Sequence, residues 1–197
     1  MKHCPLFPLN MTLFPGGRIP LQIFEARYID LVKSCMKAEQ GFIVISIKDG
    51  HESGNRPELY NIGTYAEIVD WELLPSGLLG ITVEGRQRFI LSDITEAKDK
   101  LLSASVEPIA AEDSHSVPDE YRHLVDILKS LKTNPVIQSL NLNIDYQSAT
   151  DVSSRLCELL PFNIEDKQSL LELHDPLERL VRVQAILDIM GSDFNIR

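Results

Sequence analysis

The sequence of residues 5–28, PLFPLNMTLFPGGRIPLQIFEARY, decides the fold of this chain. Its prolines favour an extended chain, because the proline ring fixes φ and removes a backbone donor. The Pro15-Gly16-Gly17 segment predicts a sharp turn, since glycine adopts backbone angles that other residues avoid. A pattern typical of an amphipathic helix follows. We therefore expect an extended N-terminal edge, a corner and a helix in quick succession.

This helix is predicted to begin near Phe24 and to end at Gly41. Its apolar residues recur at helical spacing, which places them on one face. They are Phe24, Tyr28, Leu31, Val32, Cys35 and Met36. Charged residues occupy the other face. We expect Phe24 and Tyr28 to anchor the helix to the core.

Short strands are predicted after the helix. Residues 42–47 are β-branched and almost wholly apolar, which is typical of a strand covered on both sides. A polar loop is expected at residues 48–57. Further strands are predicted at residues 63–71, 78–84, 88–91 and 101–106, with turns at 75–77 and at Glu84-Gly85. Strands at this spacing favour an antiparallel sheet or a small barrel.

The pattern becomes helical after a boundary at residues 107–119, which is rich in proline and acidic residues. Ser116 is predicted to cap a helix whose buried stripe is Tyr121, Leu124, Val125 and Leu128. Further helices are predicted from Asp151 to Leu160, from Asn163, and from Asp175 to a stop at Gly191. We therefore expect an α+β protein: residues 1–110 form a β-rich subdomain with one embedded helix, and residues 111–197 form an α-helical subdomain.

Composition excludes several classes of function. The chain has 197 residues and a formal net charge of −10, which disfavours binding through a nucleic-acid phosphate backbone. Its three cysteines, Cys4, Cys35 and Cys157, are widely spaced and predict reduced thiols rather than disulfides or a metal site. No apolar run is long enough for a membrane span, and the first residues do not resemble a signal peptide. We expect a soluble, cytoplasmic protein.

The sequence contains no catalytic constellation that we can align. Residues 80–87 have the glycine spacing of a Walker A loop, but Arg86 and Gln87 stand where lysine and a hydroxyl residue are required. The histidines do not have the spacing of zinc ligands. Asp113-Ser114-His115 contains the residue types of a triad, but adjacent side chains in a loop rarely converge. We expect no cofactor and no metal, and a small hydrolase with an unrecognised Ser/His site stays as an alternative.

Two surfaces are candidates for binding a macromolecule. Arg86 and Arg88 share a predicted strand face beside Phe89, which leaves RNA binding as an alternative. Trp71, Leu78 and Leu79 surround a predicted hairpin tip and would form an apolar patch for a polypeptide. The competing interpretation is that these three large residues are buried in the core.

The chain resembles the N-terminal substrate-binding domain of Lon proteases. The resemblance is carried by Pro5-Leu6-Phe7-Pro8-Leu9, by Leu13-Phe14-Pro15-Gly16 and by Ile23-Phe24-Glu25-x-Arg27-Tyr28. Further similar segments are Gly63-Thr64-x-Ala66, the Gly80 to Arg88 stretch, Leu159-Leu160-Pro161, residues 165–171 and Asp175-Pro176-x-Glu178-Arg179-Leu180. The match extends over nearly the whole chain.

This resemblance implies a PUA-like pseudo-barrel followed by a helical bundle. It also implies that the domain binds unfolded or tagged polypeptides, or a protease or adaptor protein. The ATPase and peptidase segments of such proteases have no counterpart in these residues, so we expect a stand-alone domain without catalysis of its own. Its expected role is that of an adaptor or regulator of proteolysis, without nucleic-acid or membrane partners, and a homo-oligomer stays open.

Overall fold

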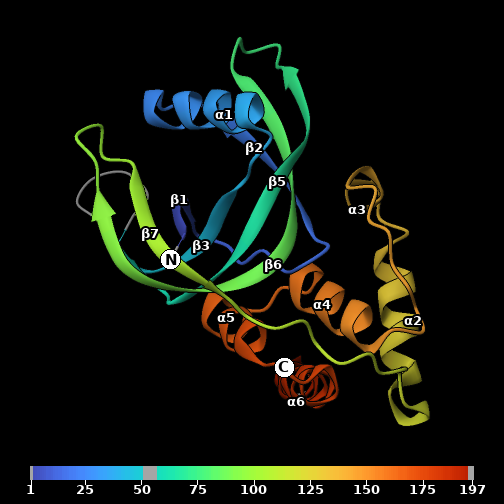
Figure 1. Ribbon diagram of the computed structural model, residues 1–197. Helices are drawn as coiled ribbons and strands as arrows, with labels where there is room; N and C mark the ends of the chain where they lie inside the picture. The colour runs from blue at the N-terminus through green and yellow to red at the C-terminus, as the bar shows by residue number, and fades with distance from the viewer. Residues whose placement is uncertain (1, 51–56, 195–197) are drawn as a thin grey trace. The chain divides into compact units, whose positions relative to one another are not determined.

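Figure 1 shows the computed structural model of the chain, which describes residues 2–50 and 57–194. The chain forms two compact units, residues 1–110 and 111–197. The first is built mainly from strands and the second from helices, so the predicted α+β class is confirmed. Of the polar loop expected at residues 48–57, residues 51–56 lie outside the described residues.

Five strands of the first unit close into a ring. They are β1 (Lys2–Leu9), β3 (Phe42–Asp49), β5 (Ile62–Leu73), β6 (Leu79–Glu96) and β7 (Leu102–Pro108). Neighbours pair in the order β1-β7-β6-β5-β3, and a parallel pairing between β1 and β3 completes the ring. Two strands lie off the ring: β4 (Glu58–Leu59) pairs with β3, and β2 (Arg18–Ile23) pairs with β6. This closure is the pseudo-barrel that the sequence predicts.

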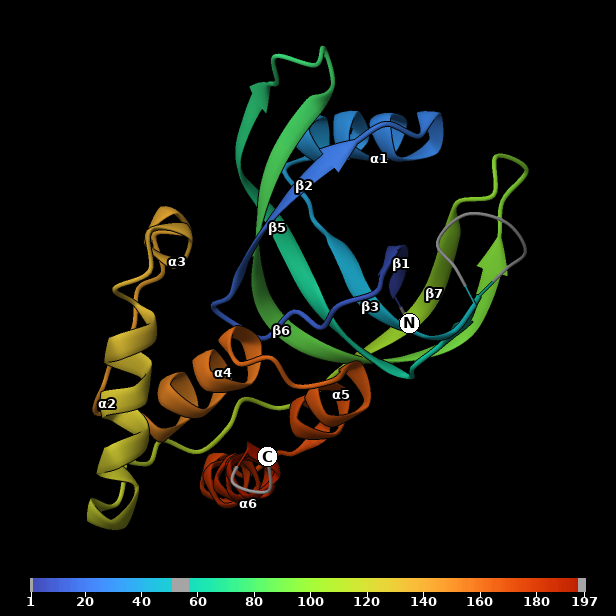
Figure 2. The same cartoon turned by 180° about the vertical axis from the view of Figure 1, so that it is seen from behind.

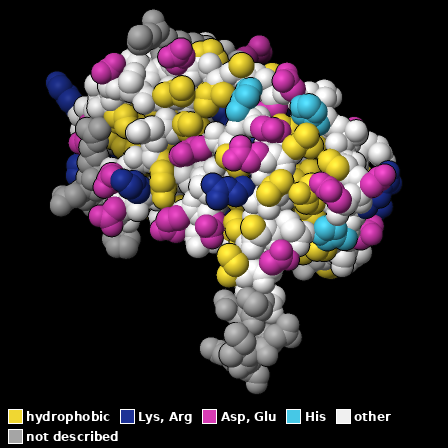
Figure 3. All heavy atoms as spheres, turned by 90° about the horizontal axis from the view of Figure 1, so that it is seen from below, with side chains coloured by type: hydrophobic (Ala, Val, Ile, Leu, Met, Phe, Trp, Pro, Cys, Tyr) yellow, Lys and Arg dark blue, Asp and Glu magenta, His cyan; other side chains and the backbone are white. Residues whose placement is uncertain are grey.

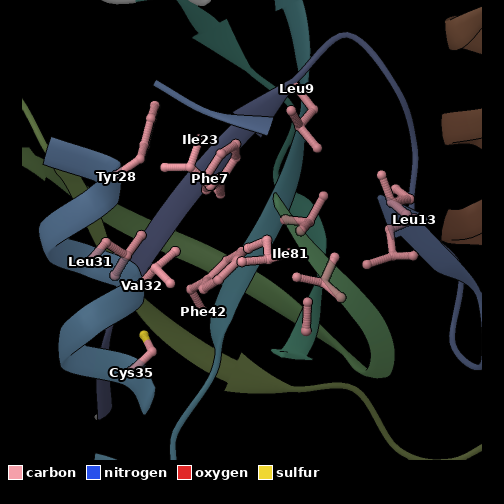
Figure 4. Packing of buried hydrophobic residues seen from close by; sticks show 14 residues of the cluster. Phe7, Leu9, Leu13, Ile23, Tyr28, Leu31, Val32, Cys35, Phe42 and Ile81 are labelled. Carbon is pink, nitrogen blue, oxygen red and sulfur yellow. The ribbon is translucent and has the colours of Figure 1, made fainter. Parts of the chain in front are cut away.

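Alternation along the strands separates the buried apolar side chains into two clusters. One cluster packs α1 (Ala26–Ala38) against β1, β2, β3 and β6, and Figure 4 shows Phe7, Phe42 and Ile81 within it. Phe7 stacks on Tyr28 of α1 with ring centroids 4.2 Å apart. The other cluster joins residues of β1, β3, β6 and β7, with Tyr65 of β5 packed against it. β1 and β3 contribute to both clusters, which explains their nearly continuous apolar sequences.

The start of α1 differs from the prediction. The helix begins at Ala26, so Phe24 lies before it and is 67% exposed instead of anchoring it. Met36 is also exposed, because the narrow contact with the sheet covers only part of the predicted stripe. The anchoring residues are Tyr28, Leu31, Val32 and Cys35, all buried.

The end of α1 also differs. Glu39 adopts the left-handed conformation with φ 51°, and its N–H donates to the carbonyl of Cys35. Glu39 therefore ends the helix, and Gly41 does not. Gly41 is required for another reason: a Cβ there would lie 1.9 Å from the carbonyl oxygen of Ala66 in β5.

The Pro-Gly-Gly corner docks directly on β6. Gly16, with φ 76°, donates its N–H to the carbonyl of Gly85 over 2.8 Å, and Gly85 donates to the carbonyl of Gly17 over 2.9 Å. The hairpin turn predicted at Glu84-Gly85 is wrong, because β6 runs unbroken from Leu79 to Glu96. Gly85 is a glycine because the corner approaches so closely that a Cβ would lie 2.4 Å from the carbonyl oxygen of Phe14.

We expect Gly85→Ala to destabilise the protein by about 3 kcal/mol, because the added methyl group meets a backbone atom that cannot move without breaking the corner. Urea unfolding followed by circular dichroism measures this loss. Gly191→Ala is the control: its Cβ meets nothing within 4 Å and it lies inside a helix, so a gain of about 0.5–1 kcal/mol is expected. Equal stability of wild type and Gly85→Ala would contradict the close approach.

The second unit contains five α-helices among the described residues. They are α2 (Arg122–Leu131), α3 (Pro135–Ser139), α4 (Ala149–Leu159), α5 (Ile164–Glu172) and α6 (Pro176–Phe194). The predicted starts of α5 and α6 are confirmed, since Asn163 accepts from the N–H of Asp166 and Asp175 from that of Leu177. In α4 the N-cap is Ser148, so the helix starts at Ala149, earlier than the predicted Asp151.

Three expectations for this unit are wrong. Ser116 caps no helix; it forms an isolated bridge with Ser148, and a short 3₁₀ turn precedes α2. The stripe Leu124, Val125 and Leu128 of α2 is buried as predicted, whereas Tyr121 lies before the helix and is only partly buried. α6 does not stop at Gly191 but continues to Phe194. The sequence analysis did not predict α3.

A buried arginine organises this unit. Arg179 of α6 is 1% exposed, and its Nε and Nη2 donate to the carbonyls of Leu170 and Leu173 at the end of α5. The guanidinium also forms a two-pronged ion pair with Glu112, which precedes the helices. Arg179 therefore joins the entry segment to α5 and α6 through a charge pair with fully engaged donors.

We expect Arg179→Met to destabilise the protein by about 3–5 kcal/mol, because the Glu112 carboxylate, whose side chain is only 10% exposed, loses its charge partner. The free energy of urea unfolding, followed by circular dichroism, measures the effect. Arg122→Met is the matched control, since the ion pair of Arg122 with Asp119 is exposed and its loss should change stability by less than about 1 kcal/mol. Equal effects of the two substitutions would contradict the structural role of Arg179.

Candidate binding surface

The outer half of the β5–β6 hairpin extends beyond the ring as an arm. β3 pairs with β5 only as far as Ala66, so residues 67–73 pair with β6 on one side. β2 lies on the other side of β6, and Figures 1 and 2 both show β5 as the outer strand of this arm. The hairpin closes through Leu74, whose N–H donates to the carbonyl of Leu78, and Gly77 supplies the positive φ of the turn.

Two rungs of apolar residues cross the three strands of the arm. Leu21, Ile81 and Trp71 form one rung, and Ile23, Leu79 and Leu73 form the other. Directly paired residues point to the same face of a sheet, so all six face the side that carries α1. Ile23 and Ile81 are buried, whereas Trp71 is 59% and Leu73 is 74% exposed. The apolar core therefore stops at β6 and leaves its outermost strand uncovered.

We call Trp71, Leu73 and Leu79 the arm surface. Of the residues predicted from the sequence, Trp71 is exposed, and Leu79 lies in the same face, half buried. Leu78 is at the turn and does not belong to either rung. Leu73 was not among the predicted site residues, although its spacing of two from Trp71 places both on one strand face. Full burial of the three predicted residues, the competing interpretation, does not hold for Trp71.

The opposite face of the arm is polar and hollowed. Its hollow has a volume of about 190 Å³ and lies over Gly80. The residues that line it come from all three strands and from the turn, and two of them are acidic: Pro20, Leu21, Gln22, Asp70, Trp71, Glu72, Leu74, Gly80, Ile81 and Thr82. Gly80 leaves room for its neighbours, since a Cβ there would lie 3.2 Å from Leu74 and 3.3 Å from Glu72. The arm thus presents an apolar face and an acidic face.

The unpaired edge of β5 has two features that hinder the addition of another strand. The register between β5 and β6 shifts between Ile68 and Asp70, which marks a bulge. Immediately after it, Asp70 Oδ1 accepts a hydrogen bond of 2.9 Å from the N–H of Trp71. Bulges and charges of this kind are common ways of blocking the edge of a sheet. Residues 67–73 contain three acidic residues and no lysine or arginine.

The basic patch expected at Arg86 and Arg88 does not form. The register shifts between Thr64 and Ala66, which turns Arg88 inward so that it is 4% exposed. Arg86 is exposed, but it pairs with Glu67 at 2.7 Å and also with Glu84. Figure 3 shows acidic side chains spread among hydrophobic ones over its face, without a gathered basic area. Arg86 and Arg88 therefore do not share an exposed face, which was the basis of the RNA-binding alternative.

The described residues offer little for a nucleophilic site. Asp113, Ser114 and His115 are all exposed, and among the described contacts none joins their side chains. Burial raises the pKa of the Cys35 thiol to about 11, with a smaller contribution from Cys4. Burial likewise raises the pKa of Cys157 to about 12. A raised pKa leaves less thiolate at neutral pH, so neither thiol is an activated nucleophile.

Within residues 2–50 and 57–194, no three side chains of the metal-binding types come together to hold an ion. Across these ranges, no helix combines the length and apolar character needed to span a bilayer.

Known proteins resemble this chain over nearly its whole length. The family model for the ATP-dependent protease La (LON) substrate-binding domain matches residues 3–188. The Lon proteases of Buchnera aphidicola subsp. Schizaphis graminum and of Parabacteroides distasonis are 29% and 28% identical to it, each over 93% of the chain. The chain spans only 24% and 23% of those two proteins, about a quarter of their length.

Two solved structures have the same fold. A Lon N-terminal domain protein from Xanthomonas campestris superposes with a TM-score of 0.78 at 29% identity, over 94% of this chain and 98% of the other. The N-terminal domain of a Mycobacterium avium complex Lon protease has a TM-score of 0.60 at 18% identity, over 92% of this chain and 96% of the other. The second likeness concerns the fold alone.

Trp71 is the single tryptophan, so its fluorescence reports on the arm surface directly. We expect quenching by caesium ions to exceed quenching by iodide, when each is expressed relative to N-acetyltryptophanamide. The reason is that Asp70 and Glu72, the neighbours of Trp71 in β5, make the potential around the arm negative. Glu72→Gln should reduce the difference. Emission typical of a buried indole, insensitive to both ions, would contradict the exposed position of Trp71.

Proposed function

This chain belongs to the family of the ATP-dependent protease La (LON) substrate-binding domain, and from this premise we propose that it captures unfolded or tagged polypeptides at the arm surface. The observation that supports this site is the pair of apolar rungs, which are buried or partly buried at β2 and β6 and exposed at β5. A single exposed apolar residue is ordinary for a soluble protein. Adjacent ones that continue a core are typical of a binding site.

The proposed mechanism is burial of apolar side chains of the client against Trp71 and Leu73. An indole supplies a large rigid contact area with few rotatable bonds, which limits the entropy lost on binding. Unfolded segments expose such side chains and folded proteins hide them, so selectivity for unfolded chains follows from burial. The surface is small, and we therefore expect weak binding to one site unless several copies act together.

We further propose that the chain acts as an adaptor or regulator of proteolysis in the cytoplasm, delivering or withholding clients without hydrolysing them. The similarity to Lon proteases covers their substrate-binding part, and their proteolytic activity is not transferred to these residues. A protease or another adaptor protein is the expected partner. The β-rich residues 1–110 carry the client site in this proposal.

The test is fluorescence anisotropy of a labelled, permanently unfolded protein titrated with this chain without ATP. We expect saturable binding that the folded form of the same protein does not compete away. Replacing Trp71 and Leu73 together by alanine should weaken binding about tenfold or more, as loss of central apolar residues does at other interfaces. Circular dichroism of the variant should be unchanged, since both side chains are largely exposed.

Ile189→Ala is the matched control, because Ile189 of α6 is 63% exposed and lies outside the arm. Its binding should equal that of the wild type. No binding of the unfolded protein by the wild type would overturn client capture, and equal losses in both variants would overturn the arm as its site. Cleavage of the labelled protein during the titration would instead support the hydrolase alternative, and competition by RNA that is lost at high salt would support the nucleic-acid one.

A further inference from the structure

We propose that the free edge of β5, residues 67–73, binds its client as an added β-strand in which apolar and basic residues alternate. This inference rests on the proposed function and specifies the chemistry of the client. It follows from three features of the arm: an unpaired strand edge, an apolar face with exposed rungs, and an acidic opposite face.

The edge is available for pairing. In the described part of the chain, no strand pairs with residues 67–73 on the side away from β6. An extended peptide placed there would gain main-chain hydrogen bonds, as in other complexes in which a peptide adds a strand to a sheet. An unfolded client is already free of competing backbone hydrogen bonds. Strand addition therefore fits the class of client that the family is expected to recognise.

The apolar face of the arm determines that every second residue of the client is apolar. A strand beside β5 would lie about 4.8 Å away, with its side chains in line with those of β5. Its residues opposite Trp71 and Leu73 would extend the two rungs that now end at these side chains. Apolar residues at those positions would cover the indole and the leucine, completing a core that is buried as far as Ile81 and Ile23.

The acidic face of the arm determines that the client residues between the apolar ones are basic. Asp70 and Glu72 lie on the opposite face of β5, and residues 67–73 contain no positive charge. Side chains of an added strand alternate between faces, so the residues flanking each apolar one would stand beside these carboxylates. Lysine or arginine there forms favourable cross-strand pairs, whereas acidic residues would be repelled. The client is thus an alternating apolar and basic segment.

The same charges disfavour a second copy of this chain as the occupant. Edge-to-edge pairing of two arms would bring Asp70 and Glu72 of one copy toward the same carboxylates of the other. The bond from the Trp71 N–H to Asp70 Oδ1 adds a local barrier, since an incoming strand must replace it. A basic client would instead be attracted to these carboxylates, and it would compete with the Trp71 N–H for Asp70. The edge therefore disfavours pairing with a second copy and favours the proposed client.

The test uses short labelled peptides and the full chain. The parent peptide alternates valine and lysine, and its control has the same composition with the lysines in one block. Two further peptides carry N-methyl groups on alternate amides, one on the set facing β5 and one on the set facing away. We expect the block peptide to bind about tenfold more weakly than the parent, because its side chains cannot serve both faces.

We also expect one N-methylated peptide to bind like the parent and the other not to bind measurably, because only one set of amides can pair with β5. Glu72→Gln should weaken parent binding about threefold and reduce its salt dependence, while Glu96→Gln, an exposed residue of β6 beyond the arm, should leave both unchanged.

Equal binding of all four peptides, or of the two N-methylated ones, would overturn strand addition. If the unfolded protein still binds and the Trp71 and Leu73 substitutions still weaken that binding, only this inference fails. If the unfolded protein does not bind either, the proposed function fails with it.

Discussion

The docking of the Pro15-Gly16-Gly17 corner on Gly85 is the constraint on which the rest of the first unit depends. Two backbone hydrogen bonds join the corner to the middle of β6, and neither tolerates a side chain at residue 85. From this point β2 follows β6 outward in antiparallel register. The corner therefore determines both the third strand of the arm and the place from which α1 returns to the core.

The arm surface is a consequence of that geometry. The first half of β6 belongs to the arm and its second half belongs to the ring. The pairing of β3 with β5 ends at Ala66. α1 buries the rungs of β2 and β6 through residues such as Tyr28 and Val32, but it does not cover the outer residues of β5. A large indole remains in water at the rim of a well-packed core, in the arrangement expected of a site completed by a partner.

The two units differ in whether their important charged side chains are buried or exposed. In the helical unit the important charges are buried and paired, since Arg179 and Glu112 hold the entry segment and two helices together. Removing one member of such a pair leaves the other charge without its partner in a largely buried position. On the arm the carboxylates of Asp70 and Glu72 are exposed to solvent, and negative charges at the edge of a sheet disfavour the pairing of two copies. The overall negative charge of the chain supports the same outcome.

Local patterns in the sequence were sufficient for the elements whose signals are local. The extended conformation of the N-terminal segment, the Pro-Gly-Gly corner, the core strand at Phe42 and the starts of α5 and α6 are confirmed, because proline, glycine and capping residues act on their own neighbours. The N-terminal strand is not an edge, because β1 pairs with β7 and with β3. The family resemblance is confirmed as well, because its motifs follow one another along the chain.

Features that depend on distant contacts required the tertiary structure. Glu84-Gly85 has the sequence of a turn, but the corner at Gly16 makes it the middle of a strand. Arg88 is buried because of a register shift, and Phe24 is exposed because α1 begins after it. The sequence by itself determined that Trp71 and Leu73 share a face. Only the folded chain decided that this face is open, because exposure depends on where β3 ends and on which strands α1 covers.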